Sequence, residues 1–328
     1  MYTCEACVNK MQEEVLIMTK IVNGYAYPFI RQEVLEWWLP RLTWISCFSY
    51  GFREDGSLVN LADYSLTAPA NSAGVKPLMV LTPMNDEGHF SDVAAAAVFE
   101  NPDAKENLIN NIEQNVKQKN LAGIDFDFEY IRAEYADDYV ALVAGAAARL
   151  RPQGYLVTAA LAPKTSADQA GLLYQGHNYK GMGQAADYCL LMTYEWGYAF
   201  GPPLPVSPIN NVRRVIEYGL SEIPAEKILL GMSNYGYDWT LPFVKGRDRA
   251  EKLSNYQARA RAEYYSAEIQ YDEEAQAPFF EYTDPAGREH IVWFEDERSW
   301  RARLALTDEY GLAGISIWNI MNIFYGGI

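Results

Sequence analysis

The chain of 328 residues is long enough for one large domain or two ordinary ones. Hydrophobic residues make up 49% of it and aromatic residues 14%, which supports a sizeable core and excludes an intrinsically disordered chain. Its formal net charge is −16 at pH 7 and it has no basic stripe, so we expect no nucleic-acid partner and no binding to anionic membranes.

The N-terminal segment offers little chemistry. Charged residues interrupt the first 22 positions, so we expect no signal peptide, and we treat residues 1–14 as an N-terminal extension. No apolar run reaches 18 residues, so we expect no membrane-spanning helix. The cysteines fall into two groups. Cys4 and Cys7 form a lone C-x-x-C pair, which is a weak pattern for a zinc or redox site. Cys47 and Cys189 lie in apolar runs and are expected to be buried thiols.

Eight short apolar segments have the length and composition of β-strands. They lie at 15–27, 42–50, 76–81, 121–130, 155–161, 187–194, 228–232 and 314–318. Segments with helical periodicity lie between them at 32–38, 101–119, 133–150, 212–218 and 299–310. Strands that alternate with helices favour parallel pairing with helical crossovers. Eight such units in about 300 residues predict the α/β class and a (β/α)₈, or TIM, barrel.

One segment does not fit this alternation. The stretch at 241–295 is too long for a loop, and it contains three further strand-like segments at 268–271, 279–282 and 291–294. This pattern predicts a small α+β insertion between the seventh strand and the last helix. We therefore expect a single barrel domain at 15–328 that carries an insertion at 241–295.

The most informative stretch runs from Ile124 to Glu129, where apolar and acidic residues alternate strictly. Period two is typical of a β-strand, so Asp125, Asp127 and Glu129 project from one face with β-carbons roughly 6 to 7 Å apart. Three such carboxylates repel one another, and we expect at least one raised pKa. A solvated strand face would also be acidic, but the apolar opposite face and flanks favour an acid catalyst, which needs a carboxyl group still protonated near neutral pH.

TIM barrels carry their active sites at the carboxyl ends of the strands. The residues at these predicted ends are acids, aromatics and amides, without a cationic cluster or a glycine-rich phosphate loop. A single aromatic residue at a strand end is more readily explained by packing than by binding. The number of aromatic residues at one rim, however, favours a neutral sugar polymer as the substrate. The candidates are Tyr25, Tyr27, Ser49, Tyr50, Asn85, Asp125, Asp127, Glu129, Tyr194, Glu195, Trp196, Asn234, Tyr235, Trp318 and Asn319.

The segment from Gly123 to Glu129 resembles the D-x-x-D-x-D-x-E signature of glycoside hydrolase family 18, the chitinase family. Residues 192–194 are similar to the family's strand-six motif, and Trp318 matches the tryptophan that closes strand eight. More narrowly, the chain resembles the bacterial spore-germination branch, whose members are cortex-lytic N-acetylglucosaminidases acting on peptidoglycan. The segments that carry this likeness are 22–25, 192–198, 201–203, 235–239 and 293–296.

Three positions depart from the chitinase pattern. Ala122 stands where many chitinases have the first aspartate, Glu195 stands where they usually have aspartate, and the third strand lacks the usual S-x-G-G. The second departure fits the spore branch, and the third argues against a plain chitinase.

The resemblance implies retaining, substrate-assisted catalysis without a metal or cofactor. It implies that Glu129 is the general acid/base, that Asp127 orients the substrate's acetamido group and that Asp125 tunes Asp127. Tyr194 would complete the catalytic set by a hydrogen bond to the acetamido oxygen. Together with the residues at the strand ends, the expected substrate-binding residues are Tyr25, Tyr50, Asn85, Glu195, Trp196, Asn234, Tyr235 and Trp318.

We therefore expect a glycosidase that acts on a GlcNAc-containing polysaccharide, either peptidoglycan or a chitin-like polymer. The alternatives are a chitinase, an endo-N-acetylglucosaminidase acting on N-glycans and a non-catalytic GlcNAc-binding lectin. The lectin is less favoured because Glu129, Asp127 and Tyr194 are all present. The resemblance implies a location at the spore or the cell wall.

Overall fold

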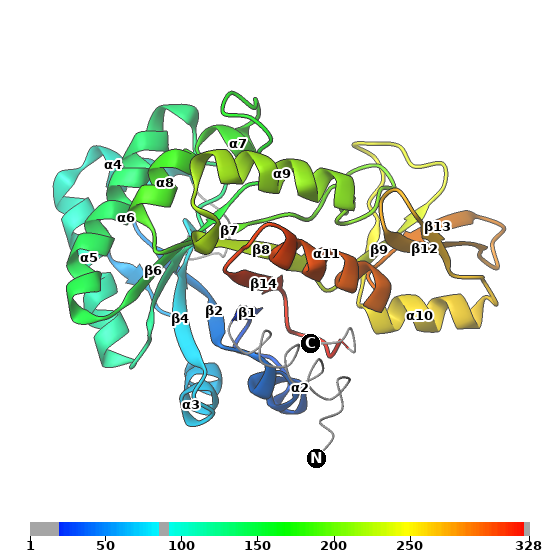
Figure 1. Cartoon of the computed structure of the whole chain (residues 1–328), viewed down its shortest axis with the longest axis horizontal. Helices are drawn as coiled ribbons and strands as arrows, with labels where there is room; N and C mark the ends of the chain where they lie inside the picture. Colours follow the sequence, from blue (N-terminus) through cyan, green and yellow to red (C-terminus); the bar gives the residue numbers. More distant parts are fainter. Residues whose placement is uncertain (1–19, 85–91, 325–328) are drawn as a thin grey trace, which may run out of the picture.

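The computed structural model describes residues 20–84 and 92–324, and eight parallel strands within them form a closed ring (Figure 1). These strands are β1 (Ile21–Ala26), β2 (Trp44–Phe52), β4 (Lys76–Leu81), β5 (Gly123–Phe126), β6 (Leu156–Leu161), β7 (Tyr188–Leu191), β8 (Ile228–Ser233) and β14 (Gly314–Trp318). Their order is β1-β14-β8-β7-β6-β5-β4-β2, and the pairing of β1 with β2 closes the ring. A short strand, β3 (Leu58–Val59), pairs with β2 in antiparallel orientation. The predicted (β/α)₈ barrel is confirmed.

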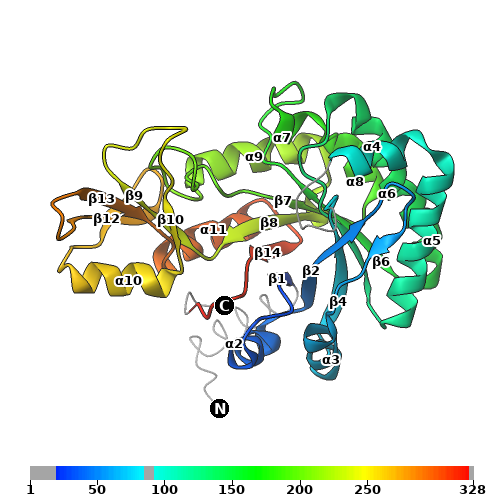
Figure 2. The ribbon, with the colours of Figure 1, turned by 180° about the vertical axis from the view of Figure 1, so that it is seen from behind.

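Helices cover the outside of the ring (Figures 1 and 2). They are α2 (Gln32–Trp38), α3 (Tyr64–Ser72), α4 (Asp92–Glu100), α5 (Pro102–Gln118), α6 (Ala136–Leu150), α7 (Leu172–Gln175), α8 (Tyr179–Ala185), α9 (Ile209–Glu222) and α11 (Glu297–Glu309). The sequence predicted α2, α5, α6, α9 and α11 to within a few residues at each end. It did not predict α3, α7 and α8, because α3 contains Pro69, α7 is a single turn and α8 contains Gly181 and Gly183.

The junction between α4 and α5 illustrates how local sequence sets the helix ends. The side chain of Asn101 accepts hydrogen bonds from the backbone N–H groups of Asp103 and Ala104, which caps α5. Pro102 fits the first turn of α5, where no backbone N–H donor is needed, and it disfavours helical geometry at Asn101. Two separate helices therefore meet at this point, and α4 was missed by the sequence analysis.

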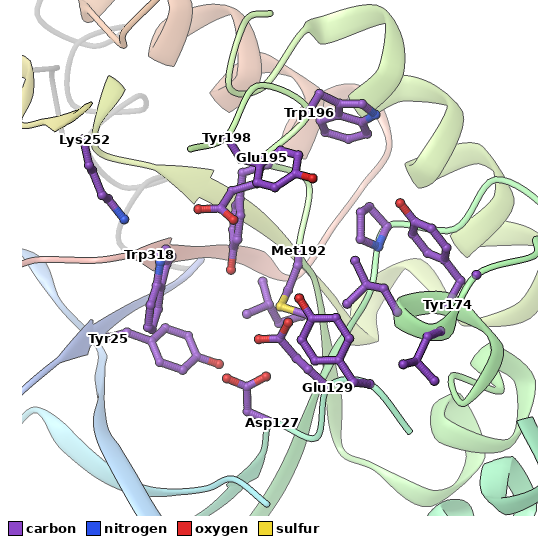
Figure 3. A pocket seen from close by; sticks show the side chains of 17 residues that line it. Tyr25, Asp127, Glu129, Tyr174, Met192, Glu195, Trp196, Tyr198, Lys252 and Trp318 are labelled. Atoms are coloured by element: carbon purple, nitrogen blue, oxygen red, sulfur yellow. The ribbon is translucent and has the colours of Figure 1, made fainter. Parts of the chain in front are cut away.

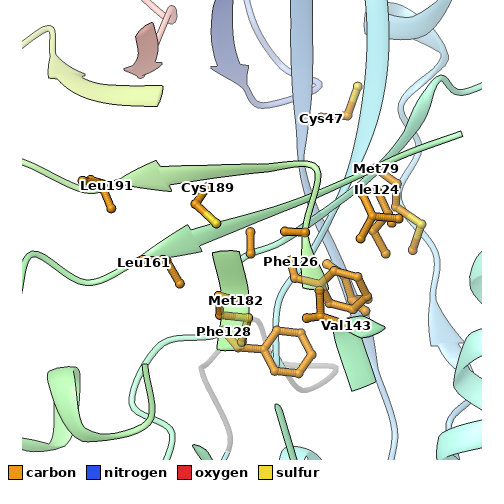
Figure 4. Close-up of a cluster of buried hydrophobic side chains, with 14 of the residues drawn as sticks. Cys47, Met79, Ile124, Phe126, Phe128, Val143, Leu161, Met182, Cys189 and Leu191 are labelled. Carbon is orange, nitrogen blue, oxygen red and sulfur yellow. The ribbon is translucent and has the colours of Figure 1, made fainter. Parts of the chain in front are cut away.

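The alternation along the acidic strand separates two cores. Ile124, Phe126 and Phe128 are fully buried between the ring and the helices (Figure 4). There the Phe128 ring stacks on Tyr139 of α6 with centroids 4.9 Å apart. A second cluster fills the inside of the barrel, and Tyr25 on β1 belongs to it. Both faces of β5 are thus buried, so a solvated strand face is excluded.

A second sheet of five antiparallel strands lies to one side of the barrel (Figure 1). Its order is β10 (Glu251–Leu253), β9 (Gly236–Thr240), β13 (Glu289–Trp293), β12 (Ala277–Thr283) and β11 (Gln270–Asp272), and the helix α10 (Asn255–Tyr264) packs beside it. The sheet begins at Gly236, before the predicted start of the insertion at 241. Sequence analysis missed β9 because it continues almost directly from the barrel strand β8.

A buried ion pair joins this sheet to the barrel. Arg303 of α11 pairs with Glu295, which also accepts a hydrogen bond of 3.0 Å from Ser233 at the end of β8. Both charged side chains are fully buried, so loss of either partner would leave an uncompensated buried charge.

Among the described residues, no helix has the length and apolar character needed to cross a membrane. The predicted N-terminal extension at 1–14, the start of the first predicted strand at 15–19 and the candidate residue Asn85 lie outside the described residues.

Candidate active site

A cavity of about 620 Å³ opens at the carboxyl ends of the barrel strands, and 17 side chains line it (Figure 3). Three segments that follow strand ends supply most of the wall, at 127–130 after β5, at 163–174 after β6 and at 192–198 after β7. Trp318, the last residue of β14, and Tyr25 of β1 form the opposite side, and Lys252 comes from β10 of the second sheet.

The three carboxylates of the acidic stretch lie at increasing distance from the barrel core. Asp125 is 2% exposed, and it accepts hydrogen bonds from Thr158 Oγ1 at 2.6 Å and from the Tyr25 hydroxyl. Asp127 is 5% exposed and lines the cavity, and its Oδ1 atom has no hydrogen-bond partner among the described residues. Glu129 is less buried and also lines the cavity.

All three carboxyl groups have raised pKa values. Burial raises the pKa of Asp125, although hydrogen bonds from Thr158 and Tyr25 oppose this shift. Burial, together with the charges of Glu129 and Asp125, raises the pKa of Asp127 well above its usual range. Burial and the charge of Glu195 raise the pKa of Glu129 to about 7. A carboxyl group with this pKa is half protonated near neutral pH, which suits a group that must both donate and accept a proton.

Glu195 is held beside Glu129 by two tyrosines. Its Oε1 atom accepts a hydrogen bond of 3.0 Å from the hydroxyl of Tyr235 and another of 3.0 Å from that of Tyr237. Glu195 has a φ of +66° and Tyr130 a φ of +59°, the left-handed region that non-glycine residues rarely occupy. Two such residues on the wall of one cavity indicate a backbone arranged for function rather than for stability.

Tyr194 remains a hydrogen-bond donor in this setting. Burial and the charges of Asp127 and Glu129 raise the pKa of its hydroxyl well above the usual value. The phenol is therefore neutral at physiological pH and can donate a hydrogen bond into the cavity.

An aromatic cluster forms the other side of the cavity. The Trp318 ring is held edge-on by Phe48 and Tyr25, with centroids 4.9 Å and 5.5 Å away. These contacts fix the indole while part of it remains accessible from the cavity. A fixed and accessible aromatic face is a suitable platform for the apolar face of a sugar ring.

The family of the chain follows from comparison with known proteins. The family model described as "Glycosyl hydrolases family 18" matches residues 26–322. The chain belongs to glycosyl hydrolase family 18. This match runs from the end of β1 past β14 and includes the whole second sheet.

Individual relatives narrow the likeness within family 18. The "Cortical fragment-lytic enzyme" of Bacillus subtilis (strain 168) is 42% identical over 281 residues, which are 86% of this chain and 65% of that protein. The "Putative sporulation-specific glycosylase YdhD" of the same organism is 36% identical over 294 residues, which are 89% of this chain and 69% of that protein. This chain thus spans just under two thirds of the length of the first relative.

A solved structure agrees with these relatives. The crystal structure of the spore cortex-lytic enzyme SleL of Bacillus megaterium QM B1551 is 39% identical, with a TM-score of 0.88. The likeness covers 93% of this chain and 71% of that chain. Within family 18, the chain is therefore similar to the spore cortex-lytic branch, as the sequence analysis expected.

The structure brings most of the predicted site residues of this family 18 chain together. Seven of them line the cavity, namely Tyr25, Asp127, Glu129, Tyr194, Glu195, Trp196 and Trp318. Asp125 and Tyr235 act through residues that line the cavity. Asp125 accepts a hydrogen bond from the hydroxyl of Tyr25, and the hydroxyl of Tyr235 donates one to Glu195.

Tyr50 does not belong to this group. Its side chain is fully buried in the core between ring and helices, where its hydroxyl donates to Asp63 and accepts a hydrogen bond of 2.7 Å from Lys119 Nζ. The pairing of β2 with β4 shifts register between Cys47 and Tyr50, so the alternation of faces is broken just before Tyr50. Position at a strand end was therefore a misleading signal, because a bulge is not visible in the sequence.

Tyr50→Phe is expected to lower the free energy of unfolding by about 1 to 3 kcal/mol, because buried Asp63 loses a hydrogen-bond donor. Urea unfolding checks this, with Tyr64→Phe at a highly exposed position as the matched control. An unfolding midpoint for Tyr50→Phe equal to that of the control would contradict the structural role.

Asn234 also lies outside the cavity. Its side-chain nitrogen donates to the backbone carbonyls of Asn319 and Asn322 at 3.2 Å each, and its oxygen accepts a hydrogen bond of 3.1 Å from Asn255. The side chain is 3% exposed and both its polar atoms are engaged, so it has no remaining group for a substrate. Asn234 therefore joins the end of the barrel to the start of α10, the helix beside the second sheet.

Several residues of the cavity were not predicted. They are Tyr130, Pro163, Gly171, Leu172, Leu173, Tyr174, Leu190, Met192, Tyr198 and Lys252. Tyr130 directly follows the acidic stretch, and Met192 and Tyr198 lie inside the segment 192–198, so their position could have been found. The residues at 163–174 and Lys252 reach the cavity through a long loop and the second sheet, and no sequence pattern indicates this.

Proposed function

We propose that the chain is a glycoside hydrolase that cleaves the β-1,4 bond after N-acetylglucosamine in peptidoglycan of the spore-cortex type. The observation that carries this proposal is the pairing of Glu129, with a pKa of about 7, and Asp127, with an unpartnered buried oxygen, in one cavity. The 42% identity to the cortical fragment-lytic enzyme of Bacillus subtilis supports the substrate class.

Glu129 is the general acid and base of the proposed reaction. Its proton passes to the glycosidic oxygen while the carbonyl oxygen of the substrate's own acetamido group attacks the anomeric carbon. The carbon–oxygen bond to the leaving sugar breaks, and a cyclic oxazolinium ion forms. Glu129, now ionised, then takes a proton from water, which opens this ion at the anomeric carbon and gives a product with retained configuration.

Asp127 and Tyr194 position the acetamido group. The free Oδ1 atom of Asp127 accepts the acetamido N–H and stabilises the positive charge that develops on the ring. The neutral Tyr194 hydroxyl donates to the acetamido oxygen and directs it toward the anomeric carbon. Trp318 lies beneath the sugar that carries this group.

Product analysis by mass spectrometry tests the proposal. Purified cortex and vegetative peptidoglycan are incubated with the protein and with Glu129→Gln. New reducing ends at N-acetylglucosamine that are absent with the variant would support the proposal. Intact peptidoglycan alongside cleaved chitin oligomers would assign a chitinase instead, and retention on the polymer without cleavage of either would assign a lectin.

The pH dependence of kcat/KM is expected to fall on the alkaline side as the pH rises through about 7, because Glu129 must be protonated to act as the acid. The charge of Glu195 contributes to the raised pKa of Glu129, so Glu195→Gln lowers this pKa. We therefore expect the alkaline limb of Glu195→Gln to move to lower pH. Glu263→Gln on α10 is the control, and a limb that stays in place for Glu195→Gln would contradict the assignment.

A further inference from the structure

Lys252 is the one cation among the described residues that line the cavity. It lies on β10, opposite Tyr237 of β9, so the second sheet carries its ammonium group to the cavity that holds Glu129 and Trp318 (Figure 3). The remaining polar side chains of this wall are carboxylic acids and phenols. An isolated ammonium group in an acidic cleft calls for a specific explanation.

Aromatic rings hold the ammonium group of Lys252 in place, but no described residue forms an ion pair or a hydrogen bond with it. Nζ lies 3.8 Å from the centroid of the Tyr235 ring and 6.0 Å from that of Tyr237. These rings cannot turn away, because both hydroxyls bind Glu195. Within residues 20–84 and 92–324, no carboxylate lies within 4.0 Å of Nζ and no atom accepts a hydrogen bond from it.

The tyrosine faces also favour the charged form of this lysine. Burial lowers the pKa of Lys252 and the charge of Glu195 opposes that shift. The ring beneath Nζ adds a cation–π attraction that exists only for the ammonium form. In its ammonium form, the side chain presents a positive charge and N–H donors to whatever occupies the cavity.

We propose that Lys252 determines specificity by binding a carboxylate on the sugar next to the cleaved bond. This inference rests on the proposed function, since peptidoglycan alternates N-acetylglucosamine with muramic acid. Both neighbours of the cleaved N-acetylglucosamine are then muramic acids. Where its lactyl group is not closed into the cyclic lactam, a muramic acid carries either a free carboxylate or a peptide that ends in its own carboxylate. Chitin has no anionic group, so Lys252 distinguishes the two polymers.

A competing role for Lys252 is to offset the negative charge of Glu195 and Glu129. The two roles predict different effects of losing Lys252 on neutral and on anionic substrates. An offsetting charge would affect every substrate equally and would shift the alkaline limb of the pH profile. Loss of a carboxylate-binding residue would affect only anionic substrates and would lower their affinity.

The test compares glycan strands that differ in one group. The strands carry a free lactyl carboxylate, a peptide with its carboxylate, methylamides in place of either carboxylate, or the cyclic lactam of muramic acid. Initial rates are measured for the wild type, Lys252→Met and Lys252→Arg, with Lys180→Met on the exposed face of α8 as the control.

Lys252→Met is expected to lower kcat/KM about tenfold on the carboxylate strand, equal to about 1.4 kcal/mol, and to change it less than about twofold on the methylamide and lactam strands. Lys252→Arg retains the preference, because a guanidinium also binds a carboxylate. The preference of the wild type weakens as salt is raised. If Lys252→Met lowers kcat/KM on the strand with the lactyl carboxylate, that carboxylate is the one bound; if it does so on the strand with the peptide, the peptide carboxylate is bound.

Two results would overturn the inference. One is a wild type that does not distinguish carboxylate from methylamide strands, and the other is an equal loss on all strands with Lys252→Met. Binding of the same strands to Glu129→Gln and to Glu129→Gln with Lys252→Met separates this inference from the proposed function. If no strand is cleaved but binding still depends on both Lys252 and the carboxylate, the proposed activity fails and the inference stands.

Discussion

Glu129→Gln is expected to lower kcat about 10³-fold on peptidoglycan strands, because the amide can neither donate a proton to the leaving sugar nor accept one from water. Steady-state kinetics on soluble strands measure this loss. An activated aryl glycoside needs less help in departing, so the loss on such a substrate is expected to be smaller. Glu263→Gln on an exposed face of α10 serves as the control. Wild-type turnover of a substrate with a poor leaving group by Glu129→Gln would remove this residue from the mechanism.

The same variant should be more stable than the wild type at alkaline pH. Folding raises the pKa of Glu129 from 4.5 to about 7, so ionisation of this buried group increasingly opposes folding as the pH rises between these values. Above pH 7 the full penalty applies, on the order of 1 to 3 kcal/mol, and the neutral amide escapes it. Urea unfolding at pH 8 and pH 4 checks this expectation, since the difference should vanish at pH 4. Equal stability at both values would mean that the carboxyl group is not held in a raised-pKa environment.

The placement of the acidic stretch could be predicted because it depends on local sequence. Strict alternation from Ile124 to Glu129 places three apolar side chains in the outer core and three carboxylates along one line. Burial is the larger cause of the raised pKa in all three carboxyl groups. Like charges add to the shift for Asp127 and Glu129, and the charge that acts on Glu129 is that of Glu195, outside the strand. The ring of eight strands could also be predicted from the sequence, because each strand is a short apolar run between helical segments.

Other parts of the site depend on contacts between residues that are far apart in the sequence. The face on which Tyr50 lies depends on a bulge against β4, and the role of Asn234 depends on the carbonyls of Asn319 and Asn322. Lys252 reaches the cavity only because β10 pairs with β9 beside the barrel. Such placements arise from tertiary packing, which sequence periodicity does not encode.

The departures from the chitinase pattern acquire a physical meaning in this setting. Glu195, where chitinases usually have aspartate, reaches the hydroxyls of Tyr235, just before β9, and of Tyr237, within β9. This contact places a negative charge where it raises the pKa of Glu129. Ala122 stands where many chitinases have an acid, and Asp125 is hydrogen-bonded by Thr158 and Tyr25. The carboxylates are therefore tuned by hydroxyl donors and by Glu195 rather than by a fourth acid in the strand.

Asp127→Asn is expected to lower kcat about 10²- to 10³-fold with a smaller change in KM, because the amide can still accept the acetamido N–H but cannot stabilise the oxazolinium charge. Steady-state kinetics on peptidoglycan strands give both parameters, and Asp103→Asn in the exposed first turn of α5 is the control. A charged intermediate analogue should lose affinity by a similar factor, whereas a neutral product should bind about as well as to the wild type. A loss in kcat below about threefold would contradict the proposed role, since the removal of a charge that faces the reacting ring has a large effect in any mechanism with a cationic intermediate. If kcat falls but the affinity for the charged analogue does not, Asp127 acts by orienting the acetamido group rather than by stabilising its charge.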